Sequence, residues 1–435
     1  MSSGHLSQKL YGVEMIDLDY LTPSEEWSFS DVKRSETLYA THGYHKYPAK
    51  FIPHLVRKLL QEYSDPGDHI LDPFGGCGTT LVEAKLSGRN SFGIDVNKVA
   101  VLISRAKIRA ISPKLLERKN QDLLDKVSGS QRDRDYYTGA HPRLRYWFKR
   151  HQYNKLATIY GYIKAEPHTG LRTFYKCCFS NILKNCSIWL AKSIKPQRDP
   201  HKVEVEPLAA FTKHLNFMTQ RNGQFWNLLE TGVSEGNYCR AIKGDARKLP
   251  MSPECVDLIV TSPPYVTSYE YAELHQLSTL WFGFADDIGE LRKDFIGTSS
   301  HAHLKSIRHN PGTLARDTVK KLSKVSKGTA RHVANYYADL MKCYREMCRV
   351  LKPSKRLCLI LGNTEYLGIK IPNTEVSIEC LQELGFKIEK VIKRQLSAKI
   401  FTPFRDKAGR FTDAEHGNQR KVYQYEYLIV ARKRK

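Results

Sequence analysis

The sequence lacks the cysteine spacing and the long apolar runs that mark several classes of protein. Its 10 cysteines include no CxxC pair, which argues against a zinc ribbon or a disulfide framework and fits a reducing compartment. No apolar run approaches the length of a membrane span, and residues 1–10 lack the apolar core of a signal peptide. We therefore expect no membrane partner and a cytoplasmic location, or a nuclear one in a nucleated cell.

Acidic residues are scarce relative to basic ones. The chain has 45 Asp and Glu residues against 69 Lys and Arg residues, which gives a formal net charge of +24. An enzyme of small acidic metabolites rarely needs so strong a positive field, whereas a polyanion is attracted by it. The composition therefore predicts a polyanionic partner, with nucleic acid ahead of a membrane surface.

Residues 68–107 read as strand, glycine-rich turn, helix, strand and helix. A short apolar strand at 70–71 precedes the turn Gly75-Gly76-Cys77-Gly78, and a helix is expected from Thr79 or Thr80 through Lys85. A second strand at 91–94 closes on an aspartate. This order is typical of the opening βαβ unit of a doubly wound parallel sheet.

The rest of the chain completes an α/β fold with a helical insertion. Amphipathic helical patterns fill residues 111–238, after which strands return, and the last two apolar segments suit an antiparallel pair. We predict a doubly wound, Rossmann-like sheet of about seven strands with that insertion and a basic loop. The expected parts are an amino-terminal arm, the first half of the core, the helical insertion, and a second half that contains the basic loop: 1–38, 39–110, 111–238, and 239–435 with the loop at 285–335.

The glycine-rich turn disfavours two common nucleotide sites, those for a nucleoside triphosphate and for a nicotinamide cofactor. A phosphate loop would have lysine after the last glycine, where this chain has Thr79, and the dinucleotide fingerprint would have glycine where it has Leu81. The strands that end at Asp95 and Asp245 would place carboxylates at the edge of the site. Asp95 suits ribose hydroxyls and Asp245 suits an adenine amino group, although Asp245 alone could equally form a turn.

A second motif lies in "DLIVTSPPYVTSYEY", residues 257–271. An apolar run stops at Ser262 and is followed by two prolines and a tyrosine. Each proline ring removes an N–H and fixes φ, so the pair cannot extend a central strand. It forms instead a stiff loop at the carboxyl end of a strand, where open α/β sheets place their ligands.

Four motifs together carry a family resemblance. They are "HGYHKYPAKFIP" (42–53), "DPFGGCGTT" (72–80), "GIDVN" (93–97) and "TSPPY" (261–265). The set resembles the S-adenosylmethionine-dependent DNA amino-methyltransferases, and it is most similar to the branch that methylates N4 of cytosine. The resemblance spans 42–110 and 239–365. It implies that the Rossmann-like sheet is a methyltransferase sheet.

The resemblance implies S-adenosylmethionine as cofactor. The motifs assign to its binding a set of residues from the upstream segment, the glycine-rich turn and the two strand ends: Lys50, Phe51, Asp72, Pro73, Phe74, Gly75, Gly76, Gly78, Thr79, Thr80, Asp95, Asp245 and Ala246. No metal is implied.

The resemblance also assigns the catalytic loop, Ser262, Pro263, Pro264 and Tyr265. The Ser262 side chain and the Pro263 carbonyl would accept hydrogen bonds from the target amino group, and Tyr265 would stack on the base. Since that amino group is paired inside a duplex, the base must be flipped out. Methylation of cytosine C5 is excluded, because it needs a cysteine nucleophile on a Pro-Cys loop and no Pro-Cys dipeptide occurs.

A basic segment at 290–335 is the best candidate for contact with double-stranded DNA. Its glycines and serines predict a mobile loop that orders on the phosphate backbone, and seven of its residues are assigned to that contact: Arg292, Lys305, Arg308, Arg316, Lys320, Lys321 and Lys324. His301 and His303 lack the further ligands of a metal site. The mixed basic and aromatic stretch 143–155 is equally compatible with target recognition and with a core.

The leading hypothesis is therefore a site-specific cytosine-N4 DNA methyltransferase, cytoplasmic and associated with the nucleoid in a prokaryote and nuclear in a eukaryote. A separately encoded restriction endonuclease is a candidate partner, and the chain could equally act alone, as monomer or dimer. The alternatives are an adenine-N6 DNA methyltransferase, an RNA base amino-methyltransferase, a nucleic-acid binder without activity, and a nucleotide-dependent enzyme. The missing lysine of the turn disfavours the last of these.

Overall fold

The computed structural model describes residues 8–10, 13–15, 18–48, 50–130, 134–193, 195–230, 237–266, 271–297, 312–396, 404–405, 420–421 and 424–435. These residues form two compact units. The glycine-turn unit comprises Lys33–Pro250 and Tyr269–Phe295, and the proline-loop unit comprises Met1–Val32, Met251–Ser268 and Ile296–Lys435. The predicted second half of the core, 239–435, is thus divided between the two units. Its first strand, at 239–243, belongs to the glycine-turn unit.

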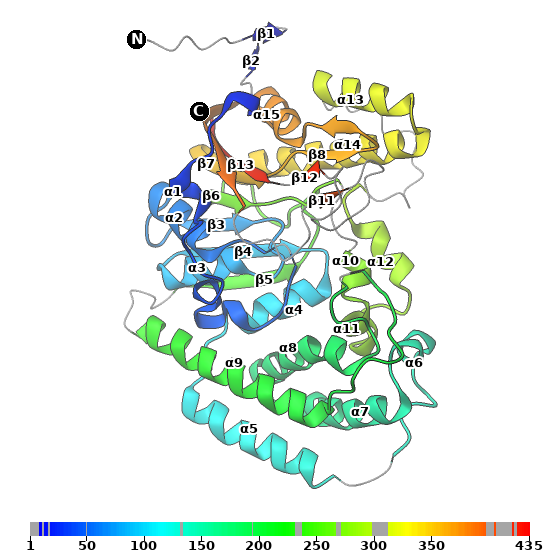
Figure 1. The fold of residues 1–435 in the computed structure, drawn as a ribbon. Helices are drawn as coiled ribbons and strands as arrows, with labels where there is room; N and C mark the ends of the chain where they lie inside the picture. The colour runs from blue at the N-terminus through cyan, green and yellow to red at the C-terminus, as the bar shows by residue number, and fades with distance from the viewer. Residues whose placement is uncertain are drawn as a thin grey trace. The chain divides into compact units, whose positions relative to one another are not determined.

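Seven of the described strands form one mixed sheet in the order β10-β13-β7-β6-β3-β4-β5 (Figure 1). The strands are β3 (His69–Asp72), β4 (Asn90–Asp95), β5 (Cys239–Lys243), β6 (Val256–Thr261), β7 (Leu351–Leu361), β10 (Phe386–Gln395) and β13 (Tyr425–Lys433). The last two pair antiparallel with each other, and β13 pairs antiparallel with β7. The predicted fold class, an α/β Rossmann-like sheet of about seven strands with a terminal antiparallel pair, is confirmed.

In the glycine-turn unit, β3, β4 and β5 are parallel and place their carboxyl ends at one edge. Asp72 pairs in register with Gly93, and Asp95 pairs with Lys243. Helix α2 (Pro53–Tyr63) begins with a proline at its first position, where no intrahelical N–H bond is lost. Helices α3 (Thr79–Leu86) and α4 (Lys98–Lys107) follow β3 and β4, and the side chain of Asn97 caps α4 by accepting from the Val99 N–H.

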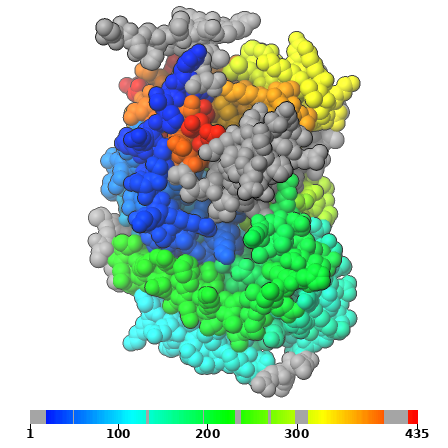
Figure 2. Space-filling model, viewed as in Figure 1, coloured from blue at the N-terminus to red at the C-terminus, as the bar shows by residue number. Residues whose placement is uncertain are grey.

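Residues 111–238 contain the predicted helices. They are α5 (Pro113–Ser128), α6 (Pro142–Trp147), α7 (Arg150–Ala165), α8 (Thr169–Cys186) and α9 (Pro207–Glu230). Figure 2 shows the exposed side of this layer, with α9 in green above α5 in cyan. Trp147 and Phe148 are buried in its core, where Trp147 stacks on Trp189, whereas Tyr146 is exposed. The aromatic stretch at 143–155 therefore contributes at least these two side chains to packing.

Three short helices complete the glycine-turn unit after the gap at 267–270. They are α10 (Tyr271–Leu274), α11 (Gln276–Trp281) and α12 (Ile288–Asp294). Gln276 is fully buried, and its Oε1 accepts hydrogen bonds from Trp147 Nε1 at 3.1 Å and Arg143 Nε at 2.6 Å. These bonds fix α11 against α6.

The proline-loop unit packs helices around β6, β7, β13 and β10. Every residue of β6 is buried, as expected for a central strand of a parallel pair with β7. The helices are α13 (Thr313–Ser323), α14 (Lys327–Val350) and α15 (Asn373–Glu383), and Ser326 caps α14 by accepting from the Thr329 N–H. Strand pairs β8 (Thr364–Tyr366) with β9 (Ile369–Ile371), β1 (Gln8–Leu10) with β2 (Val13–Met15), and β11 (Phe404–Arg405) with β12 (Arg420–Lys421) are short.

Part of the expected amino-terminal arm is packed in the proline-loop unit. Helix α1 (Glu25–Ser28) lies against β10, Trp27 is buried, and its carbonyl accepts from Arg394 Nε at 2.9 Å. Ser28 Oγ accepts from the Gln395 N–H at 2.9 Å. The remaining short elements are 3-10 turns at Leu18–Tyr20, Glu36–Leu38 and Ala40–Gly43.

The predicted basic loop at 285–335 is helical over most of the residues that the structure describes in this range, so the prediction of a loop is wrong there. Helix α12 and helix α13 lie in this range, and α14 begins in it. The segment Thr313–Ser323 is helical because Ala315, Thr318 and Leu322 recur at helical spacing and are buried together. Residues 298–311 lie outside the described residues, with His301, His303, Lys305 and Arg308 among them. No described helix is long and apolar enough to cross a membrane.

Candidate cofactor site and catalytic loop

The glycine-rich turn is bound to the end of β4 and requires glycine for steric reasons. The Gly75 N–H donates to the Ile94 carbonyl at 2.9 Å. Gly76 and Gly78 have φ of +48° and +77°, which side-chain-bearing residues rarely adopt. A Cβ at Gly78 would lie 2.8 Å from Ser104 Oγ, and that hydroxyl donates to the Gly76 carbonyl at 2.8 Å. The turn therefore passes close to β4, α4 and Tyr47, and its glycines form a backbone cradle without side chains.

Asp95 joins the turn to the carboxyl end of β4. Its Oδ2 accepts from the Gly76 N–H at 2.9 Å, and its Oδ1 accepts from the Asn97 N–H at 2.8 Å. Burial raises the pKa of Asp95 to about 6, against the opposing effect of these two hydrogen bonds. Each carboxylate oxygen retains a second acceptor site, so the side chain can still receive hydroxyl donors.

Asp72 and Thr80 hold the turn from inside. The Asp72 carboxylate is buried and accepts from Thr80 Oγ1 at 2.7 Å and from the Phe74 N–H at 3.1 Å. Thr80 is fully buried, and Thr79 is nearly so. These side chains thus fix the shape of the turn around Pro73 and Phe74.

Asp245 follows β5, as predicted, but its carboxylate already has a cationic partner. Arg247 contacts it with Nε at 3.0 Å from both oxygens and with Nη2 at 2.8 Å from Oδ2. The same Nη2 donates to the Asp294 carbonyl at 3.0 Å. Ala246 is buried. The adenine contact assigned to Asp245 stays a prediction, and it would have to be made beside this ion pair.

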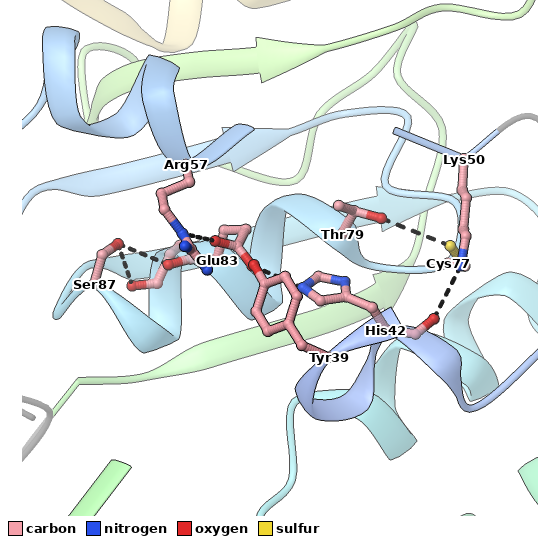
Figure 3. A network of polar contacts seen from close by, with 9 residues as sticks. Tyr39, His42, Lys50, Arg57, Cys77, Thr79, Glu83 and Ser87 are labelled. Carbon is pink, nitrogen blue, oxygen red and sulfur yellow. Dashed lines mark hydrogen bonds and ion pairs between the residues drawn. The ribbon is translucent and has the colours of Figure 1, made fainter. Parts of the chain in front are cut away.

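Lys50 comes from the upstream segment and lies beside Cys77 of the turn (Figure 3). Its ammonium donates to the His42 carbonyl at 3.1 Å. Burial, and then the positive charge of Lys107, lowers the pKa of Lys50 to about 8. A half-buried cation here suits a carboxylate group of a ligand.

A buried carboxylate on α3 holds the upstream segment in place, and the motifs did not reveal it. Glu83 accepts from Tyr39 Oη, from His42 Nε2 at 2.7 Å and from Arg57 Nε at 3.1 Å (Figure 3). Burial lowers the pKa of His42 to about 4, so its imidazole is neutral and Arg57 supplies the charge. Burial alone would raise the pKa of Glu83, but its hydrogen-bond and charge partners lower it.

Tyr47 lies in the upstream motif at 42–53 but is not among the residues assigned to cofactor binding. A Cβ at Gly76 would lie 3.6 Å from its Cε1, so its ring borders the turn. The ring stacks on Tyr271 with a centroid separation of 6.0 Å and lies 5.0 Å from the ring of His275. Burial, and then the nearby Asp95 carboxylate, raises the pKa of Tyr47 well above its ordinary value.

The glycine-turn unit brings together the three features that S-adenosylmethionine needs. The backbone cradle of the turn can receive its chain, the Asp95 carboxylate can accept ribose hydroxyls, and the Lys50 ammonium can pair with its carboxylate. The residues therefore fit this cofactor. Phe51 is partly buried on the same segment as Lys50.

The Ser-Pro-Pro-Tyr loop, to which a catalytic role is assigned, follows β6 in the proline-loop unit. Helix α14 holds it, because Tyr336 Oη donates to the Pro264 carbonyl at 2.9 Å and His332 Nε2 lies 3.2 Å from the Val266 carbonyl. Pro263 is buried, whereas Ser262 and Pro264 are partly exposed. The loop is therefore fixed both by its prolines and by side chains about 70 residues away in the chain.

Tyr265 is held through its hydroxyl. Its Oη donates to Glu426 Oε1 at 3.2 Å, and Glu426 Oε2 accepts from the buried Arg394 Nη1 at 3.1 Å. A Cβ at Gly362 would lie 3.4 Å from the Tyr265 ring, so this glycine leaves room for it. Burial raises the pKa of Tyr265 well above its ordinary value, so the phenol stays protonated. The stacking role of Tyr265 stays a prediction.

Four of the residues assigned to DNA lie together on the exposed side of α13 and at its end: Arg316, Lys320, Lys321 and Lys324. Lys327 and Arg331 of α14 are exposed as well. Arg292 belongs to the other unit, where it pairs with Glu273. Within the described ranges no three His, Cys, Asp or Glu side chains are arranged to hold a metal ion.

Comparisons with known proteins agree with the motifs. Residues 13–106 match the N6/N4 methyltransferase family model, described as DNA methylase. The type II methyltransferase M.MvaI of Kocuria varians is 27% identical over 371 residues, which cover 79% of this chain and 81% of that protein. The type II methyltransferase M.AvaI of Nostoc sp. is 24% identical over 405 residues, which cover 80% and 79%.

Among solved structures, the chain is similar to a putative DNA modification methylase of Thermus thermophilus complexed with S-adenosyl-L-methionine. The identity is 18%, the match covers 44% of this chain and 54% of that chain, and the TM-score is 0.22. Taken together, the family model and the type II methyltransferase relatives support the wider prediction of a methyltransferase that acts on an amino group of DNA. The assignment of S-adenosylmethionine as cofactor rests on the fit of the glycine-turn residues described above. Cytosine N4 as the target stays a prediction.

Proposed function

We propose that this protein is an S-adenosylmethionine-dependent DNA methyltransferase that modifies the N4 amino group of cytosine. The observation that carries the proposal is the Ser-Pro-Pro-Tyr loop at the carboxyl end of a fully buried strand, held by Tyr336 and Glu426. The serine at the first position resembles the cytosine branch. Similarity to type II methyltransferases along most of the chain supports the same class.

The glycine-turn unit would hold the cofactor. Asp95 would bind the ribose hydroxyls, Lys50 would pair with the carboxylate, and the backbone of Gly75, Gly76 and Gly78 would lie along the chain that joins them. Bound S-adenosylmethionine supplies a methyl group on a positively charged sulfur. Glu83 and His42 would keep Lys50 in place, because the ammonium is bound to the His42 carbonyl.

The proline loop would orient the target amino group. Cytosine N4 is a weak nucleophile because its lone pair is delocalised into the ring, and acceptors for its two protons favour a pyramidal nitrogen. Ser262 Oγ and the Pro263 carbonyl would supply those acceptors, with Tyr265 against the base. Rigid positioning can contribute much of the reduction in barrier. No strong general base is required, because the methylated nitrogen is acidic and releases its proton to solvent.

The exposed basic side of α13 would contact the phosphates of double-stranded DNA. Lys320, Lys321 and Lys324 lie within about one helical turn of one another, so they can bind neighbouring phosphates. Such contacts can offset the cost, a few kcal/mol, of flipping the target base. A separately encoded restriction endonuclease is a candidate partner, since the relatives are named type II methyltransferases.

The test is the modified nucleoside itself. Genomic DNA would be taken from cells that express the protein, Ser262→Ala or the matched surface control Ser252→Ala, and its nucleosides resolved by mass spectrometry against standards. We expect N4-methylcytosine with the unaltered protein and the control but not with Ser262→Ala. N6-methyladenine would instead correct the base and keep the class. Neither mark, with cofactor still bound, would contradict a DNA substrate and direct the search to RNA.

A further inference from the structure

Tyr47 lies three residues before Lys50, and its ring borders the glycine-rich turn that Asp95 holds. Its phenol is close enough to the Asp95 carboxylate and to Cys77 for both to raise its pKa. Cys77 is in turn an electrostatic neighbour of the Lys50 ammonium. A Cβ on Gly76 would lie 3.6 Å from the Tyr47 ring, and the Gly76 N–H donates to Asp95, so the ring borders the turn next to the group that would bind ribose.

Two aromatic rings from the segment 271–275 lie next to the Tyr47 ring. Tyr271 stacks on it at an interplanar angle of 23°, and His275 lies next to it. Burial lowers the pKa of His275 to about 4, so its imidazole is neutral, and its Nδ1 is 2.8 Å from Asn97 Nδ2. Tyr47 as a whole is partly buried.

In S-adenosylmethionine, the positively charged sulfur is the atom that joins the ribose to the amino-acid chain. We propose that the ring of Tyr47 recognises this sulfonium and thereby favours the charged cofactor over its neutral product, S-adenosylhomocysteine. The inference rests on the proposed function and names a specificity-determining residue within it.

The physical basis is the attraction between a cation and the negative face of an aromatic ring, which strengthens when water is excluded. The Asp95 carboxylate acts in the same direction. Transfer of the methyl group removes the charge, so this interaction is lost with the product. Tyr47 would therefore strengthen binding of the cofactor without strengthening binding of the product.

The test is calorimetric binding of three ligands to the full chain, with no DNA present. They are S-adenosylmethionine, S-adenosylhomocysteine, and sinefungin, which carries an ammonium in place of the sulfonium. We expect Tyr47→Leu to weaken binding of both cationic ligands about 5- to 30-fold and to change binding of S-adenosylhomocysteine less than about twofold. Tyr47→Phe keeps the ring and should keep the preference for the cations.

Equal losses for all three ligands in Tyr47→Leu would reduce Tyr47 to a packing residue and overturn the inference. Loss of the preference in Tyr47→Phe would overturn it too, since the hydroxyl and not the ring face would then matter. The exposed Tyr146→Leu is the control for general effects on the protein. If the unaltered protein binds none of the ligands, the proposed function fails as well; an unaltered preference in Tyr47→Leu, with DNA still methylated, removes this inference alone.

Discussion

Asp95 shows how burial can tune a single binding residue. Two backbone N–H groups hold its carboxylate at the end of β4, yet burial raises its pKa to about 6. Hydrogen bonds from the backbone favour the ionised form, so burial outweighs them here. The residue that would accept the ribose hydroxyls therefore changes its charge just below neutral pH.

This shift predicts a pH dependence of cofactor binding. Above about pH 6 the carboxylate is ionised and accepts both hydroxyls, and below it the protonated group accepts less well. We expect the affinity for S-adenosylmethionine to fall about tenfold between pH 8 and pH 5, measured by calorimetry. Asp95→Asn should bind weakly at every pH, with a flat profile through this range. An Asp95→Asn protein that kept the affinity and the profile of the unaltered one would remove Asp95 from the site.

The pH dependence of folding stability that comes from Asp95 has the opposite sign to that of a salt-bridged aspartate, whose pKa is lowered. Because the folded-state pKa of Asp95 is raised above its ordinary value of 3.8, its contribution to stability is fully present below that value. The contribution is lost as the pH rises through about 6. Binding and folding thus favour different protonation states of Asp95, as is common at functional sites.

At the scale of elements, strands and the turn were predictable because their signals are local. The apolar run before Asp72, the apolar run before Ser262 and the glycine-rich turn are each only a few residues long. The bonds that fix the site are not local: Glu83 and His42 are 41 residues apart, and Tyr336 and Pro264 are 72 apart. No period or motif reports such a pair, so the supports of Lys50 and of the proline loop appear only in the structure.

The error at α13 has a related cause. The basic residues, glycines and serines of the segment 290–335 favoured the prediction of a loop. The spacing of the buried residues Ala315, Thr318 and Leu322 is the signal that specifies the helix. The assignment of these residues to DNA stays a prediction, and the structure places them on the exposed side of a helix and at its end.

Helix α13 gives a prediction on salt dependence. The triple substitution Lys320→Ala, Lys321→Ala and Lys324→Ala should weaken DNA binding and reduce the slope of log affinity against log salt by about 2 to 3. The measurement is a fluorescence-anisotropy titration at several salt concentrations. The matched control neutralises three exposed basic residues of α5, Lys114, Arg118 and Lys126, and should leave the slope unchanged. Equal slopes for the α13 variant and the unaltered protein would exclude α13 as the contact surface.

At the scale of the whole molecule, the chain crosses between its two units several times. The proline-loop unit is assembled from three separate stretches of sequence, and the earliest of them packs on one of the last strands. Trp27 is 5% exposed in that packing, and the Ser24 N–H donates to the Lys393 carbonyl at 2.8 Å. The amino-terminal segment is therefore part of the core of this unit.

Removing the Trp27 side chain should destabilise the proline-loop unit. We expect Trp27→Ala to lower its free energy of unfolding by about 3 kcal/mol, the cost of a large cavity in a core. The measurement is a urea titration monitored by circular dichroism. The urea concentration at the midpoint of unfolding should fall. Tyr20→Ala, which removes an aromatic ring that is 87% exposed, is the control and should change the midpoint little. A midpoint for Trp27→Ala equal to that of the control would mean that this packing does not contribute.

The packing of α1 on β10 also implies a delay during synthesis, because the two elements lie near opposite ends of the chain. The bond from Arg394 to the Trp27 carbonyl joins residues 367 positions apart, so Trp27 leaves the exit tunnel long before its partner strand is made. At ordinary elongation rates this interval is about 20 to 70 seconds. During that time the indole has no native surface on β10 to cover it and is open to chaperones. Refolding of the finished chain involves no such wait, so it should depend less on chaperones than synthesis does.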